Sequence, residues 1–148
     1  MSYLYTPVAA AWLLLPIMLQ IGWTLVLYVW LTAARLGAVR RQEAKFSTFE
    51  FGLEEPAKVA RITRNLANQY EFPVLVYFAV AALLALGEVS ALDVFAAWIF
   101  TGGRVLHTLV QTLSGNVPLR GAVFTINFLG GLLLLGHVAL LTASGLLA

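Results

Sequence analysis

Residues 58–86, KVARITRNLANQYEFPVLVYFAVAALLAL, join a polar first half to an apolar second half. The apolar part, residues 74–86, is too short to cross a bilayer alone, because a spanning helix needs about 20 residues. The segment can cross only if part of its polar half also enters the membrane, where polar side chains must face protein and not lipid. The sequence therefore predicts that this helix packs against other membrane helices along its polar face.

The rest of the chain has the composition of a membrane protein. Of its 148 residues, 61% are hydrophobic and 11% are charged, whereas about a quarter of the residues of a soluble protein are charged. Apolar length and turn residues predict four helices, at about residues 6–34, 56–87, 91–113 and 119–147. Together they predict one all-α integral membrane domain over residues 1–148, a bundle of four transmembrane helices.

The positive charges indicate how the bundle is oriented. All nine Lys and Arg residues fall in two windows, and the N-terminus, the loop around residues 87–93 and the C-terminus carry none. One window holds Arg35, Arg40, Arg41, Lys45, Lys58, Arg61 and Arg64, and the other holds Arg104 and Arg120. Because cytoplasmic loops are enriched in Lys and Arg, the sequence predicts both termini on the non-cytoplasmic side.

Charge and cysteine content exclude several classes of function. The net charge of +2 is small, so no nucleic-acid partner is expected. The chain has no cysteine, which excludes disulfides, thiolate metal sites and a cysteine nucleophile. No metal site is predicted.

Polar side chains from three of the predicted helices lie at a similar depth in the inner half of the bilayer. They are Arg64, Asn68 and Glu71 on one helix face, Arg104, His107 and Gln111 on a second, and Arg120 on the last helix. An ionised group at that depth costs a few kcal/mol, so a partner or a ligand is expected. The arginines outnumber the single carboxylate, which leaves positive charge for an anion, and a guanidinium binds carboxylates with two parallel hydrogen bonds.

A structural explanation of the same residues is also open. Glu71 would then neutralise Arg64 or Arg104, while Asn68 and His107 would form hydrogen bonds between helices. The spacing of these residues is compatible both with an anion site and with internal pairing.

Two other features predict packing and not binding. His137 stands alone in the apolar part of the last predicted helix, and we expect it to pack or to form a hydrogen bond within the protein. The glycines at 102–103, 130–131 and 136 are expected to permit close approach of helices.

Three stretches resemble one known family. Its second-helix motif, Arg-x-x-x-Asn-x-x-Glu followed by Pro, is similar to Arg64-Asn65-Leu66-Ala67-Asn68-Gln69-Tyr70-Glu71-Phe72-Pro73. The stretches from Gly103-Arg104 to Leu119-Arg120 and from Val39-Arg40 to Phe46 also match, in the same order. The family is MAPEG, membrane-associated proteins in eicosanoid and glutathione metabolism. The chain resembles its bacterial-type members, its microsomal prostaglandin E synthases and its microsomal glutathione transferases.

The resemblance implies a homotrimer that binds glutathione as a cosubstrate in a polar cleft between neighbouring subunits. The positions that match the family's glutathione-binding residues are Arg40, Arg64, Asn68, Glu71 and His107. Arg120 matches the arginine beside the glutathione sulfur, which would make it the catalytic residue.

The chain also departs from the family pattern. The prostaglandin synthases have Ser where this chain has Gly121, Tyr where it has Gln111, and a second Arg where it has Ala67. Pro73 follows Glu71 by two residues, where the family usually has three or four. These differences argue against prostaglandin isomerase activity.

The function expected from residues and resemblance together is glutathione-dependent transfer to lipophilic electrophiles, or reduction of lipid hydroperoxides, at the membrane. The expected partners are two further copies of the chain, membrane lipid and a lipophilic small molecule. One alternative is a trimer without enzymatic activity, whose arginine cleft is vestigial or binds a lipid headgroup. A second alternative is a small multidrug-type transporter.

Overall fold

A computed structural model describes residues 9–50 and 54–147, and its regular secondary structure is entirely helical. This confirms the predicted all-α class. The elements are α1 (Ala10–Arg40), η2 (Phe46–Phe49), α2 (Ala57–Ala67), η3 (Asn68–Tyr70), α3 (Phe72–Leu86), α4 (Ala91–Leu113) and α5 (Val117–Leu147).

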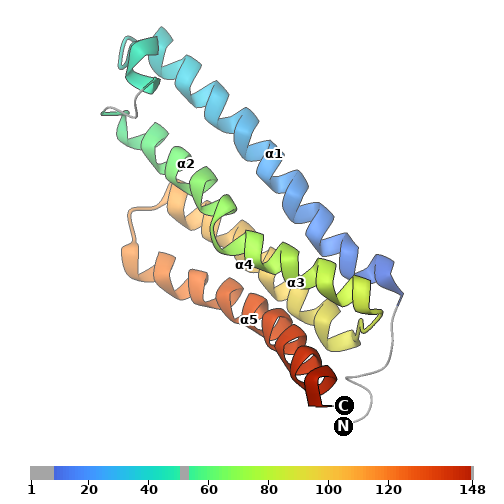
Figure 1. Ribbon diagram of the computed structural model, residues 1–148. Helices are drawn as coiled ribbons and strands as arrows, with labels where there is room; N and C mark the ends of the chain where they lie inside the picture. The colour runs from blue at the N-terminus through green and yellow to red at the C-terminus, as the bar shows by residue number, and fades with distance from the viewer. Residues whose placement is uncertain (1–8, 51–53, 148) are drawn as a thin grey trace.

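The helices lie side by side and alternate in direction (Figure 1). The start of α1, the end of α3 and the end of α5 gather at one end of the bundle. The end of α1, the start of α2 and the turn between α4 and α5 gather at the other. The connecting residues 41–50, 54–56 and 114–116 therefore lie at the same end, and they fall within the segments 35–56 and 114–118, which the positive charges predict to be cytoplasmic. We call this end, with the adjoining half of each helix, the inner half of the bundle.

Three of the helical segments have the length and apolar composition needed to cross a membrane. They are α1 (Ala10–Arg40), the α2–α3 segment (Ala57–Leu86) and α5 from Val117 to Gly145. The α4 helix has 23 residues, but no stretch of it is as apolar as the most apolar stretches of these three. Its polar side chains Arg104, His107, Thr108 and Gln111 are nevertheless buried within the protein.

The predicted helix bounds agree with the structure at α4 and differ elsewhere. The helix predicted over 6–34 continues to Arg40, because Ala38 is buried against Val59 and Ile62 of α2, and this packing extends the helix beyond the apolar run. Residues 6–8 of that prediction lie outside the described residues. The helix predicted from residue 119 begins at Val117, with Pro118 in its first turn, where proline is well tolerated.

The segment predicted as one helix over 56–87 is interrupted, which corrects that expectation. Helix α2 ends at Ala67, residues 68–70 tighten into the 3₁₀ turn η3, and Glu71 has φ −96° and ψ −107° before α3 begins. Pro73 explains the interruption, because proline has no backbone N–H to donate to the residue four positions earlier and its ring clashes with that residue's carbonyl. The interruption falls at the Asn68–Glu71 end of the polar motif.

The two halves of the bundle have different interiors. The outer half is an apolar cluster that includes Leu13, Val76, Leu83, Phe100 and Leu134, all of them fully buried. The inner half contains most of the buried polar residues, and it is the half in which the functional site is sought.

Close approach of α5 to its neighbours explains two of its glycines. A Cβ added to Gly130 would lie 2.7 Å from the backbone nitrogen of Phe100, and one added to Gly131 would overlap the ring of Phe72. The packing role predicted for residues 130–131 is therefore confirmed. It is wrong for Gly136, where an added Cβ would meet nothing within 4 Å.

We predict that Gly130→Ala destabilises the protein, because the new methyl group meets backbone atoms that cannot move aside. Overpacking of this kind costs about 1–3 kcal/mol. The matched control is Gly136→Ala on the same helix, which should keep or slightly raise stability because alanine favours helix more than glycine. Thermal unfolding in detergent measures both. Equal unfolding temperatures for the two variants would contradict the α4–α5 packing described here.

Candidate functional site

Buried amide side chains cross-link the inner half of the bundle. Gln20 Nε2 of α1 donates a hydrogen bond to Gln69 Oε1 at 2.8 Å, and Gln69 Nε2 donates to Asn65 Oδ1 at 3.3 Å. Asn65 Nδ2 in turn donates to Gln111 Oε1 of α4 at 3.0 Å. A buried amide without partners costs several kcal/mol, so these contacts fix how α1, α2 and α4 are aligned.

Arg104 is a fully buried residue of α4, and its side chain forms hydrogen bonds at the interruption between α2 and α3. Its Nη2 donates to the backbone oxygen of Asn68 at 3.0 Å, and its Nε donates to Gln69 Oε1 at 3.3 Å. Carbonyl groups in the last turn of a helix lack hydrogen-bond donors within that helix. Arg104 provides a donor to one of these carbonyl groups, that of Asn68. The sequence groups Arg104 with the arginines available to an anion, whereas the structure gives it contacts within the protein.

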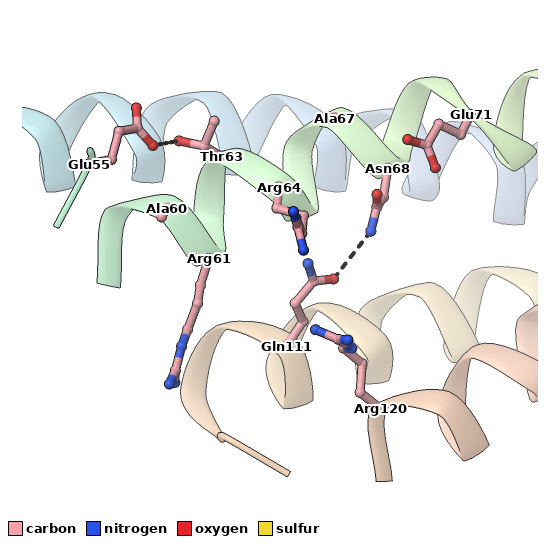
Figure 2. A pocket seen from close by; sticks show the side chains of 10 residues that line it. All are labelled: Glu55, Ala60, Arg61, Thr63, Arg64, Ala67, Asn68, Glu71, Gln111 and Arg120. Carbon is pink, nitrogen blue, oxygen red and sulfur yellow. Dashed lines mark hydrogen bonds between the residues drawn. The ribbon is translucent and has the colours of Figure 1, made fainter. Parts of the chain in front are cut away.

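An open cleft of about 760 Å³ lies along the exposed face of α2 (Figure 2). Its wall combines α2, the α2–α3 interruption, the end of α4 and the start of α5. The lining residues are Glu55, Ala60, Arg61, Thr63, Arg64, Ala67, Asn68, Glu71, Gln111 and Arg120. In Figure 2, Arg64 and Arg120 both point toward Gln111, whereas Arg61 points away from them.

A smaller cavity of about 230 Å³ adjoins the cleft and shares Arg64, Asn68, Gln111 and Arg120 with it. It is completed by His107, Gly121 and Phe124. His107 is 3% exposed, and its ring meets Phe124 edge-on with centroids 5.7 Å apart. Polar and aromatic groups therefore meet where α4 faces the first turns of α5.

The cleft has a surplus of positive charge. Three arginines and two carboxylates line it, but Glu55 is already used: its Oε1 lies 2.6 Å from Arg35 Nη2 and its Oε2 accepts from Thr63 at 2.6 Å. Over residues 9–50 and 54–147, no ion pair joins Glu71 to an arginine. Direct neutralisation of Arg64 or Arg104 by Glu71, the structural explanation that the sequence left open, is therefore not what the contacts show.

Most of the predicted site residues come together. Arg64, Asn68, Glu71 and Arg120 line the cleft, and His107 lines the adjoining cavity. Arg40 does not join them. It is the last residue of α1, is exposed there, and is absent from the lining of either space.

Gln111 is the cleft residue that sequence reasoning undervalued. The sequence shows it as a polar residue and as a departure from a family tyrosine, and does not assign it to the site. In the structure it lines both spaces, and its Oε1 accepts from Asn65 at 3.0 Å and from Asn68 at a long 3.4 Å. Its spacing of four from His107 was the available signal, but its partners on α2 depend on how α2 and α4 align.

The second histidine belongs to the opposite end of the bundle. His137 Nδ1 lies 2.8 Å from Asp93 Oδ1, and Asp93 Oδ2 accepts from both the backbone nitrogen and the hydroxyl of Ser90. The hydrogen-bonding role predicted for His137 is confirmed. The contact joins α5 to the capped start of α4. In the part of the chain that is described, no group of three or more His, Asp or Glu side chains could hold a metal ion.

Comparison with known proteins supplies the family. The MAPEG family model matches residues 13–140, which covers both the cleft and the bundle around it. The chain belongs to the MAPEG family. No curated protein and no solved structure gives a significant match.

Membership confirms the family resemblance and makes the chain an integral membrane protein. It also fits glutathione-related chemistry in general, because MAPEG proteins commonly use that thiol. The matched region contains Arg64, Asn68, Glu71 and Arg120, so the charged cleft lies within the family domain.

We predict that Arg104→Ala is strongly destabilising in this MAPEG protein, because it leaves a buried cavity and removes the donor to the Asn68 carbonyl. A loss of about 2–4 kcal/mol is expected from these two effects. Arg64→Ala removes the same side chain from an exposed position on α2 and should stay within about 0.5 kcal/mol of the wild type. Thermal unfolding in detergent compares them. An Arg104→Ala variant as stable as Arg64→Ala would show that Arg104 has no structural role.

Proposed function

We propose that the protein binds glutathione in the arginine cleft and uses its thiolate to attack lipophilic electrophiles or to reduce lipid hydroperoxides. The observation that carries the proposal is the convergence of Arg64 and Arg120 on one cleft, with Glu71 in the same wall, inside a MAPEG domain. Glutathione carries two carboxylates and one ammonium group besides its thiol. The cleft offers partners for each kind of charge.

The proposed roles are those that the family resemblance implies, and the charge and position of each residue are compatible with them. Arg64 would bind a glutathione carboxylate, for which the planar guanidinium fork is suited. Glu71 would accept hydrogen bonds from the ammonium group. Arg120 would lie near the sulfur, where a cation favours the thiolate over the thiol.

Two reactions are open to such a thiolate. In transfer, the sulfur forms a bond to an electrophilic carbon and a leaving group departs with the displaced electron pair. In peroxide reduction, the sulfur attacks the outer oxygen, the O–O bond breaks, and the lipid leaves as an alcohol after protonation. The resulting glutathione sulfenic acid then reacts with a second glutathione to give the disulfide and water. Exposed apolar side chains near Arg120 on α5, including Leu119 and Phe124, suit access from lipid.

We also propose that all four helical segments cross the membrane, with both termini on the non-cytoplasmic side. Length favours this for α4, and its polar side chains are shielded inside the bundle, as embedded polar groups require. The two connections on the cation-rich side lie at the same end of the molecule (Figure 1), as the positive-inside rule requires of a single orientation.

A trimer would complete the cleft. In one subunit Arg64 and Glu71 are exposed along α2, and charged groups at that depth should not face lipid. A neighbouring copy packed on this face would cover them. It would also give exposed Arg40 a route to the ligand, from the adjacent subunit, since Arg40 does not reach the cleft of its own chain.

One observation favours the alternative of a cleft that binds a lipid headgroup. Gly121 follows Arg120 without a side chain, and an added Cβ there would meet nothing within 4 Å. The cleft therefore lacks the hydroxyl that the family's prostaglandin synthases have at this place. A phosphate group would use the same arginines without needing that hydroxyl.

Isothermal titration of the purified protein with glutathione tests the proposal. Arg64→Ala should weaken binding by roughly 1.5–3 kcal/mol, the value of a hydrogen bond to a charged group. Arg64→Lys should recover only part of this, because an ammonium lacks the planar fork. Arg41→Ala is the matched control, since Arg41 is exposed and paired with Glu43 away from the cleft. A wild-type protein without measurable glutathione binding would refute the proposed function.

Turnover tests the role of Arg120 separately. Arg120→Ala should lower the rate with an activated aryl halide or a lipid hydroperoxide by about two or more powers of ten, as expected when one electrostatic stabiliser is removed. Glutathione affinity should change much less, because the lost interaction strengthens in the transition state. Full activity in Arg120→Ala would mean that another group stabilises the thiolate. Binding without turnover in the wild type would favour a non-enzymatic protein.

A further inference from the structure

The side-chain amide of Gln111 has an orientation that can be traced through the hydrogen bonds behind it. In general the two ends of an amide are assigned from the network, because oxygen and nitrogen look alike. Here the network begins at two groups that can only donate, the Trp23 indole and the Arg104 guanidinium. Both lead to the same residue, Asn65, which is fully buried and lies behind the cleft wall.

The first chain of hydrogen bonds starts at Trp23. Its Nε1 donates to the Thr108 hydroxyl at 3.2 Å. The hydroxyl, having accepted that bond, donates to Asn65 Oδ1 at 2.9 Å. Oδ1 is the end of Asn65 that faces Thr108. Because a hydroxyl can both donate and accept, this chain agrees with the orientation of Asn65 but does not fix it by itself.

The second chain starts at Arg104 and reaches the same atom. Arg104 Nε donates to Gln69 Oε1 at 3.3 Å, so Gln69 presents its nitrogen on the other side. That nitrogen donates to Asn65 Oδ1 at 3.3 Å. This chain assigns the orientation of Asn65, the chain through Thr108 agrees with it, and Asn65 Nδ2 therefore faces Gln111.

Gln111 receives this orientation from Asn65. Its Oε1 accepts from Asn65 Nδ2 at 3.0 Å, with a second donor at Asn68 Nδ2. The remaining Nε2 group therefore points away from these donors. In Figure 2 it faces Arg64, with Arg120 on the other side of Gln111. Three donor groups, none of which can accept, surround this part of the cleft.

We propose that Gln111 is a binding residue that selects an anionic acceptor, a thiolate or a carboxylate, through an amide N–H that Asn65 holds in place. This rests on the proposed function, because it assigns a specificity role within the same glutathione cleft. Asn65 is a positioning residue: it does not line the cleft and acts only through Gln111. A ligand that presents a donor or a cation here would meet three donors and be rejected.

Gln111→Glu is the main test, by isothermal titration with glutathione. The new side chain keeps an acceptor for Asn65 and Asn68 but presents oxygen to the cleft in place of N–H. Binding should weaken on the order of ten- to a hundred-fold, the value of one hydrogen bond to a charged group. Ala60→Glu is the matched control, because it adds the same charge to the same cleft away from Gln111. Its loss should be much smaller, and equal losses in the two variants would overturn the inference.

Asn65→Asp tests the positioning step without touching the cleft. Its second carboxylate oxygen can only accept, so Gln111 would have to turn its nitrogen toward residue 65 and its oxygen toward the ligand. The variant should lose affinity on the order of ten-fold or more in the wild-type background. It should lose much less when Gln111→Leu is already present, because the two changes act through one contact. Losses of the same size in both backgrounds would overturn the positioning role.

The ligand series separates the two anions. With S-methylglutathione, which has no thiolate, a vanished Gln111→Glu penalty assigns the amide to the sulfur, and an unchanged penalty assigns it to a carboxylate. Glutathione binding that is equal in wild type and folded Gln111→Glu overturns this inference alone. A wild-type protein that binds no glutathione overturns it together with the proposed function. If Asn65→Asp fails to fold, Gln111→Glu and its control still decide the binding role.

Discussion

The hydrogen bond from buried Arg104 to the Asn68 backbone oxygen is the contact on which the inner half of the bundle depends. Pro73 makes a continuous helix unfavourable, and the resulting interruption leaves carbonyl groups that need a donor inside the protein. Arg104 provides one from α4 at 3.0 Å. Together with the Asn65–Gln111 hydrogen bond, it sets the height of α4 against α2.

The arginines of the inner half are of two kinds, which the sequence does not distinguish: one is bonded within the protein and the others line the cleft. Arg104 is held by groups of its own protein, so its charge belongs to the structure of the bundle. Arg64 and Arg120 lie on the cleft wall, and no carboxylate of the described chain pairs with either of them. Their charge is available to a ligand. A buried charge is tolerated when it has hydrogen-bond partners, and an anion completes the set that lacks them.

The two ends of the bundle are held together mainly by different kinds of interaction. In the outer half, apolar side chains and the close contact at Gly130 hold α3, α4 and α5 together, and one polar cluster, His137 with Asp93 and Ser90, joins α5 to the start of α4. In the inner half, the amides of Asn65, Gln69 and Gln111 must each meet a particular partner. Such a network is rigid because every misalignment would leave a buried polar group unpaired. A rigid wall suits a site that must hold a small, highly charged ligand.

The sequence by itself determined the helical class, the bounds of α4 and the family, because apolar length, turn residues and the spacing of a motif are local properties of the chain. It also named four residues that line the cleft, since a helix face follows from spacing. Only the tertiary structure decided where the second segment is interrupted, that Arg104 is structural, that Arg40 lies outside the cleft, and which way Gln111 points. These depend on hydrogen bonds between residues far apart in the chain, such as Asn65 with Gln111 and Asn68 with Arg104. Composition and periodicity cannot choose one partner among many for a buried donor, whereas the packing of α4 against α2 leaves one.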